Sequence, residues 1–218
     1  MKRGFTLIEL AIVLVIIGLL IGLGAGLLGP LTRRSKYSEG KTTVNSAVEA
    51  ITGYSIRTGR LPPESDFQRI VPSYKDPWGN ELQYFLDNDL TSSICSQNET
   101  DLIVCHDTSC ANYTENVAFV VISPGDNYNY QTLDRGNNRA FVPPIGTENV
   151  DFDGSDFIRA ETYDDIVRWV TLDQLWARIC TNCGACGFYE SRSVCDSNCS
   201  VNCQQAQCGN NPNCWRCP

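Results

Sequence analysis

The segment that most constrains this chain is an apolar run near its N-terminus that contains one carboxylate. Residues 5–30 are apolar or small apart from Thr6 and Glu9, and the nineteen positions from Leu10 to Leu28 carry no charge. A helix of this length spans about 30 Å, which is the thickness of the hydrocarbon core of a bilayer. An acidic side chain at mid-bilayer costs about 3 kcal/mol or more, so Glu9 requires a specific explanation.

The features around this run differ from those of a secretory signal peptide, which has a shorter apolar core followed by a small-x-small cleavage site. Here a short basic leader, residues 1–4, directly precedes a membrane-length run. Several glycines weaken the second half of the helix, each by about 1 kcal/mol relative to alanine, and Pro30 follows them. The sequence therefore predicts a membrane helix whose second half bends easily.

The junction between leader and run resembles a known signal. Lys2-Arg3-Gly4 followed by Phe5-Thr-Leu-Ile-Glu9-Leu resembles the class III signal of type IV pilins and type II secretion pseudopilins. The resemblance implies that a prepilin peptidase cleaves between Gly4 and Phe5 and methylates the new amine of Phe5. It also places the family's conserved glutamate at Glu9. One departure is Gly26, where many type IV pilins have a proline.

The resemblance supplies a partner for the acidic side chain. After cleavage Phe5 would carry a positive amine, which Glu9 of a neighbouring subunit can neutralise. A buried charge without a partner is strongly unfavourable, whereas a paired one can specify register. The alternative is that Glu9 extends to the nearby cytoplasmic interface. We predict that Glu9 acts in filament assembly.

The charges that flank the run do not settle its orientation. They are Lys2 and Arg3 before it, and Arg33, Arg34, Lys36 and Lys41 after it. Counting these charges alone favours a cytoplasmic C-terminus. The resemblance and the cysteine-rich C-terminus favour the opposite arrangement: a single-pass protein of the bacterial inner membrane. Its N-terminus would be cytoplasmic and its head periplasmic, or extracellular in a filament.

Beyond the membrane segment, the pattern predicts a helix followed by short strands. Val44, Val48, Ile51 and Ser55 repeat with helical spacing, and Gly59 then signals an end near Thr58. Strands are expected at 81–86, 101–105, 117–122 and 165–170, and a capping box at 171–174 predicts a helix ending near residue 179. The expected fold is α+β: a long N-terminal transmembrane and amphipathic helix packed on a small antiparallel β-sheet head, with a cysteine-rich extension.

Short motifs in the head resemble the major-pseudopilin branch of the family. They are Gly59-Arg-Leu-Pro62, Asp76-Pro-Trp-Gly-Asn80, Ser123-Pro-Gly125 and Tyr163-Asp-Asp-Ile-Val167. The predicted organisation is a prepilin leader at 1–4, a helix at 5–59 with 5–30 embedded in the membrane, a head at 60–179 and a tail at 180–218.

A cation site is predicted near the end of the head. Asp151, Asp153 and Asp156 lie at near-alternating positions around Gly154, and such carboxylates suit a hard cation with oxygen ligands. The spacing is not that of an EF-hand. The resemblance indicates that calcium binds in this region, without assigning ligands residue by residue. The alternative is a solvated turn.

Cysteines are concentrated in the tail. Of twelve, nine lie in residues 180–218: Cys95, Cys105 and Cys110 belong to the head, and Cys180, Cys183, Cys186, Cys195, Cys199, Cys203, Cys208, Cys214 and Cys217 to the tail. The CxxC spacings could chelate zinc or an iron–sulfur cluster, but the expected oxidising compartment favours disulfides. Because both counts are odd, complete oxidation within one chain requires an odd number of head-to-tail bridges.

Charge and motif content exclude several functions. Residues 60–179 carry eight Lys/Arg and twenty Asp/Glu, which argues against nucleic-acid binding. No catalytic constellation or phosphate-binding glycine loop is present, so no enzyme is predicted. We expect a subunit of a type II secretion pseudopilus or of a pilus-like filament that supports protein secretion, assembled with other pilin subunits on an inner-membrane platform. The alternatives are a minor type IV pilin for adhesion or DNA uptake, and a non-polymerising membrane protein whose ectodomain binds a ligand or metal.

Overall fold

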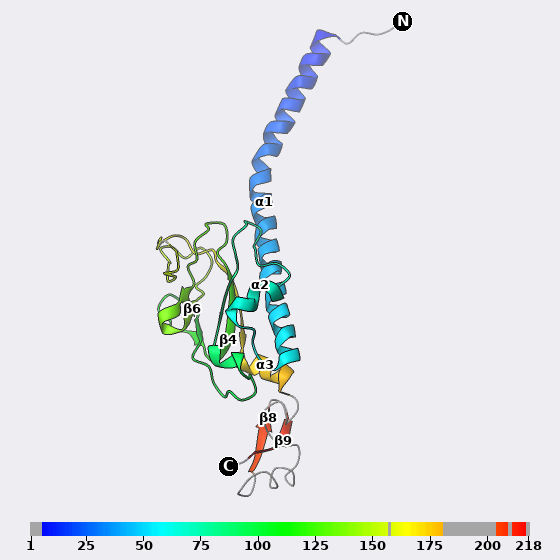
Figure 1. The fold of residues 1–218 in the computed structure, drawn as a ribbon. Helices are drawn as coiled ribbons and strands as arrows, with labels where there is room; N and C mark the ends of the chain where they lie inside the picture. Colours follow the sequence, from blue (N-terminus) through cyan, green and yellow to red (C-terminus); the bar gives the residue numbers. More distant parts are fainter. Residues whose placement is uncertain (1–5, 157, 181–203, 209–210, 217–218) are drawn as a thin grey trace. The chain divides into compact units, whose positions relative to one another are not determined.

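The computed structural model describes residues 6–156, 158–180, 204–208 and 211–216, without the side chains of residues 20–28, 30, 206–208, 211–214 and 216. The chain divides into two compact units, residues 1–39 and residues 40–218. Figure 1 shows the helices and strands of both units.

Helix α1 runs without interruption from Leu7 to Thr58, as the sequence predicted. It ends because Gly59 takes a left-handed conformation, with a φ of +72°, and donates its N–H to the carbonyl oxygen of Ser55 at 2.8 Å. In the part of the chain that the structure describes, no helix is both long enough and apolar enough to cross a membrane.

The head contains short helices and two sheets. Its elements are η1 (Glu64–Asp66), α2 (Phe67–Ile70), β1 (Gln83–Leu86), η2 (Asn88–Thr91), β2 (Ile103–Cys105), β3 (Tyr113–Thr114), β4 (Val117–Ser123), β5 (Leu133–Asp134), η3 (Arg135–Asn137), β6 (Arg139–Phe141), β7 (Ile166–Thr171) and α3 (Leu172–Ile179). The predicted capping box is present at the start of α3, between Thr171 and Gln174.

The two sheets differ in their topology. The first has the order β1-β4-β7 and is antiparallel, with Phe85 opposite Val120 and Val120 opposite Trp169. The second has the order β3-β2-β6-β5, and its β2 and β6 strands run parallel. The antiparallel sheet expected in the head is thus present, but the second sheet departs from it at the β2–β6 pair, because the chain passes through β3, β4 and β5 before it returns beside β2.

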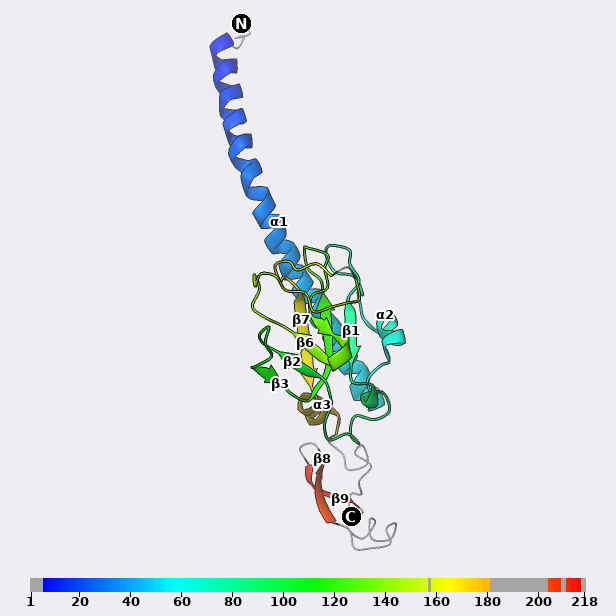
Figure 2. The same cartoon turned by 90° about the vertical axis from the view of Figure 1, so that its left-hand side faces the viewer.

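The C-terminal part of α1 covers one face of the first sheet (Figure 2). Val44, Ala47 and Ile51 are fully buried there, and Arg168 of β7 donates a hydrogen bond to Asn45 at 3.1 Å. The second sheet covers the other face, where one apolar cluster joins the two sheets: Leu102, Val104, Val117, Val120, Ile122, Leu133, Ala140 and Val167. Strand β4 lies between these layers, which explains why all seven of its residues are buried.

Within the tail, strands β8 (Gln204–Cys208) and β9 (Asn211–Arg216) pair antiparallel. Most predicted disulfide cysteines of the tail lie outside the described residues: Cys183, Cys186, Cys195, Cys199, Cys203 and Cys217. Cys208 and Cys214 belong to β8 and β9, and their side chains are not described.

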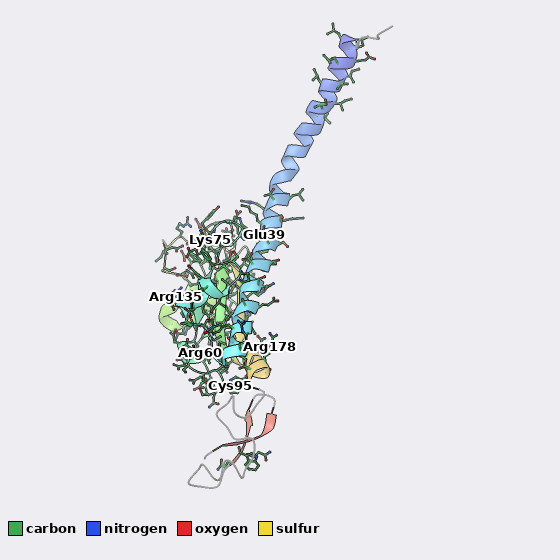
Figure 3. All side chains as sticks on the ribbon, turned by 45° about the vertical axis from the view of Figure 1, so that its right-hand side comes forward. Glu39, Arg60, Lys75, Cys95, Arg135 and Arg178 are labelled. Carbon is green, nitrogen blue, oxygen red and sulfur yellow. A yellow bond between two sulfur atoms is a disulfide. The ribbon has the colours of Figure 1, made fainter. Side chains whose placement is uncertain are left out.

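Two disulfides are present among the described residues. Cys95 bonds Cys180 with their Cα atoms 5.7 Å apart, and Cys105 bonds Cys110; Cys95 is labelled in Figure 3. The first bridge joins the head to the first cysteine of the tail. At least one such bridge is required if all three head cysteines and all nine tail cysteines are oxidised within one chain. Beside it the indole N–H of Trp176 donates to the carbonyl oxygen of Ile94 at 3.0 Å.

The two bridges should differ in their effect on stability. Replacing Cys95 and Cys180 together by alanine is expected to lower the free energy of unfolding by about 4.5 kcal/mol, because that bridge spans 85 residues. Replacing Cys105 and Cys110 removes a bridge across 5 residues and should cost about 2 kcal/mol. Urea unfolding of the oxidised full chain in detergent measures both, and equal losses would contradict the prediction.

Candidate functional site

The first turn of α1 is closed by two side chains that bind each other's backbone. Thr6 is the N-cap, since its carbonyl oxygen accepts the N–H of Leu10 at 3.2 Å. The backbone N–H of Glu9 donates to Thr6 Oγ1 at 3.4 Å, and Glu9 Oε2 accepts the backbone N–H of Thr6 at 2.8 Å. The hydroxyl of Thr6 also donates to Oε2 at 2.8 Å. This arrangement is a capping box.

The capping box gives Glu9 a partner within its own chain. Sequence reasoning missed it, although its T-x-x-E signal is the same kind of signal that predicted the start of α3. Both side-chain bonds use Oε2, and within the described residues Glu9 Oε1 accepts no hydrogen bond. The predicted cleavage and methylation residues, Gly4 and Phe5, lie outside the described residues.

The three predicted cation ligands lie in one loop of the head, before β7. Asp151 Oδ2 accepts the backbone N–H of Arg159, and Asp153 Oδ1 accepts that of Ser155 at 2.8 Å. Asp156 Oδ2 accepts the backbone N–H of Tyr130 at 3.3 Å. Partial burial raises the pKa of Asp156, and the nearby charges of Asp153 and Asp151 raise it further. The carboxylates therefore lie close enough to repel one another.

A fourth carboxylate, which sequence reasoning did not single out, joins this group. Asp165 is only 2% exposed, and its Oδ2 accepts hydrogen bonds from the backbone N–H of Gln131 at 2.9 Å and the hydroxyl of Thr132 at 2.6 Å. Burial raises the pKa of Asp165 well above its usual range, and the charges of Asp164 and Asp153 add to this effect. The only signal for it was its position as the first residue of the strand predicted at 165–170.

Several oxygen atoms in this region are buried without a hydrogen bond. Among the described residues they include Oδ1 of Asp151, Oδ2 of Asp153, Oδ1 of Asp165 and Oδ1 of Asn129. A buried polar atom without a partner costs about 1–3 kcal/mol, so such atoms require an explanation. We call Asp151, Asp153, Asp156, Asp165 and Asn129 the loop site.

The donor chemistry of the loop site fits a hard cation. Its unpaired atoms are all carboxylate or amide oxygens, the ligands that calcium prefers, and a bound cation would offset the repulsion among the carboxylates. In the described chain, no three His, Cys, Asp or Glu side chains are placed so that they could share one metal ion. A cation here would therefore draw some ligands from amide or backbone oxygens.

Comparison with known proteins identifies the N-terminal segment. Residues 1–25 match the family model of the prokaryotic N-terminal methylation motif, which is the class III signal of type IV pilins and pseudopilins. No curated protein and no solved structure matches the chain. The match covers the leader, Thr6, Glu9 and most of the apolar run, and it points to a structural protein of the pilin type.

The turn beside the loop site depends on Gly125. Gly125 and Gly146 both have a positive φ, +70° and +90°, but a Cβ atom at Gly125 would lie 2.7 Å from the carbonyl oxygen of Asp164, whereas one at Gly146 would meet nothing within 4 Å. Gly146→Ala should cost about 1–2 kcal/mol for its backbone conformation alone. Gly125→Ala should lower the free energy of unfolding by about 1 kcal/mol more than Gly146→Ala does, because Asp164 must also shift. If urea unfolding shows the same loss of stability for both variants, the close approach of Gly125 to Asp164 would be contradicted.

Proposed function

We propose that the protein is a structural subunit of a type II secretion pseudopilus or a type IV pilus-like filament, and that it polymerises through its N-terminal hydrophobic helix to support protein secretion. The observation that carries the proposal is the methylation motif at residues 1–25 with Glu9 inside the apolar run. The class III signal implies processing by prepilin peptidase and assembly with other pilin subunits.

In this proposal the protein enters the inner membrane with a cytoplasmic N-terminus and is assembled by an inner-membrane platform. Cleavage after Gly4 makes Phe5 the first residue and Thr6 the second. The amine of Phe5 on one subunit then pairs with Glu9 of its neighbour. The capping box supports this role because it fixes the carboxylate through Oε2, while Oε1 accepts no hydrogen bond from the described residues.

A second candidate is a single-pass membrane protein that does not polymerise. The capping box favours it, since Thr6 satisfies Glu9 within one chain and no neighbouring subunit is then required. The two functions differ in whether Glu9 acts through its charge or only as a hydrogen-bond acceptor, and this difference can be tested with two substitutions.

Glu9→Gln keeps an oxygen that can cap the helix but removes the charge, whereas Glu9→Leu removes both. If Glu9 pairs with an amine, both variants should insert into the membrane normally but assemble poorly. Leaving the partner amine unpaired weakens subunit association by about 3 kcal/mol or more, which is over a hundredfold. The amount of sheared filament relative to membrane-bound subunit measures this.

Thr6→Ala is the matched control, because it removes the cap at a cost of about 1 kcal/mol and leaves the charge. Normal assembly of Glu9→Gln would show that capping is the role of Glu9 and would favour the non-polymerising candidate. Wild-type protein that forms no filaments under conditions in which the machinery is active would overturn the proposed function itself.

We also propose that the loop site binds calcium. At most two of the carboxylates of Asp151, Asp153 and Asp156 would contribute oxygens to one ion, and its other ligands would be amide or backbone oxygens. The unpaired oxygens of Asp165 and Asn129 lie in the same region, since the charge of Asp153 raises the pKa of Asp165, and Tyr130, next to Asn129, donates its backbone N–H to Asp156. A bound cation supplies positive charge that neutralises the carboxylates. The support for this proposal is the set of buried oxygens that accept no hydrogen bond.

Millimolar calcium should stabilise the wild-type chain relative to chelator, by about 2.7 kcal/mol when its concentration is a hundred times the dissociation constant. Asp153→Asn should lose most of this gain. Asp87→Asn is the control, since Asp87 also accepts backbone N–H groups, from Asp89 and Asp101, but lies outside the loop site. Thermal unfolding with calcium or chelator measures the shift, and an unshifted wild-type melting temperature would end the proposal.

A further inference from the structure

The turn at residues 76–80 is built around the buried carboxylate of Asp76, which accepts more hydrogen bonds than are required to close the turn. Asp76 is 6% exposed, and its Oδ1 accepts the backbone N–H groups of Trp78 at 3.0 Å and Asn80 at 2.8 Å. These two bonds, with the N–H of Asp76 donating to the carbonyl oxygen of Asn80 at 2.9 Å, are enough to close the turn. The second carboxylate oxygen is therefore available for another part of the chain.

That second oxygen ties the turn to the end of β4. Asp76 Oδ2 accepts the hydroxyl of Ser123 at 2.8 Å, and Ser123 is fully buried. The side-chain amide of Asn80 reaches the carbonyl oxygen of Gly125 at 3.5 Å. Two segments 40 or more residues apart in the sequence are thus held together by buried polar contacts.

The turn after β4 is held by Asp164, in the segment that directly precedes β7. Asp164 Oδ2 accepts the backbone N–H groups of Asp126 at 2.8 Å and Asn127 at 3.2 Å. The neighbouring carboxylate is Asp165, whose Oδ2 accepts the backbone N–H of Gln131. The contacts therefore continue from Asp76 to the loop site.

In the other direction the same turn touches α1. A Cβ atom at Gly40 would lie 3.1 Å from the Trp78 ring and 2.7 Å from Ile166 Cδ1, so helix, indole and the first residue of β7 are in close contact. The indole N–H of Trp78 is buried without a partner, so the ring is held by packing alone. Gly40 is also the first residue of the second compact unit, which begins within α1.

We propose that the Asp76–Asn80 turn couples the loop site to α1 at Gly40, so that a cation bound at the loop site orders the part of the helix that packs on Trp78 and Ile166. Two series of contacts connect the site to the helix. In the first, Asp164 binds the turn after β4, which contacts Asp76 and so Trp78. In the second, Asp165 is followed directly by Ile166, which contacts α1 at Gly40. This inference rests on the proposed cation site. It makes cation binding a control on the packing of α1 against Trp78 and Ile166.

Coupling of this kind is reciprocal, so a change at Gly40 must alter the affinity of the loop site. Gly40→Ala forces Trp78 or Ile166 to shift, whereas Gly53→Ala introduces the same methyl group on the same helix where nothing lies within 4 Å. We expect Gly40→Ala to weaken calcium binding by about fivefold or more, and Gly53→Ala to leave it unchanged. Calorimetric titration of the full chain in detergent measures both affinities.

Hydrogen exchange of the wild-type chain tests the coupling without a substitution. Calcium should slow exchange of the amides of residues 150–166, and also of residues 36–44, by about fivefold or more compared with chelator. Slower exchange at 150–166 alone, or wild-type affinity in a folded Gly40→Ala chain, would overturn the coupling and leave the cation site intact. Absence of calcium binding to the wild type would overturn the cation site as well.

Discussion

The head depends on the burial of one stripe of α1 against the β1–β4–β7 sheet. Val44, Ala47 and Ile51 are fully buried in this contact. At the start of the contact, Gly40 allows the helix to approach Ile166 and Trp78 closely. A helix with a single apolar stripe must bury it against another element. In α1 this stripe begins at Val44, beyond a charged and polar stretch that follows the apolar run of residues 5–30, so one continuous helix carries an apolar, a polar and an amphipathic sequence.

Two buried aspartates in the head show how a structural carboxylate differs from one in a candidate binding site. Both oxygens of Asp76 accept hydrogen bonds, so its charge is satisfied by the turn and by Ser123. Asp165 is at least as deeply buried, but its Oδ1 accepts none, and other carboxylates surround it. Folding alone accounts for Asp76. Asp165 is better explained if a cation or another donor completes its surroundings.

Local signals predicted most of this architecture, and contacts between distant segments account for what they missed. Periodicity predicted the helix to Thr58, the apolar run predicted β4, and the capping box predicted α3, because each is encoded within a few neighbouring residues. The parallel pairing of β2 with β6 has no such signal, and the bridge from Cys95 to Cys180 could be constrained only by parity. The same holds for the loop site: Asp151 and Asp153 were visible as a motif, but Asp165 joins them only in the folded chain.

The capping box also changes how the charge on Glu9 is understood. An isolated carboxylate in an apolar run is unfavourable, yet the first turn of a helix has backbone N–H groups without partners and a partial positive charge. Thr6 and Glu9 satisfy each other there, so a single subunit can carry the charge before any neighbour is present. In the proposed filament, Oε1, which accepts no hydrogen bond from the described residues, would receive the amine of the next subunit. The proposal thus gives one side chain two successive roles, capping and then pairing, because each would use a different oxygen.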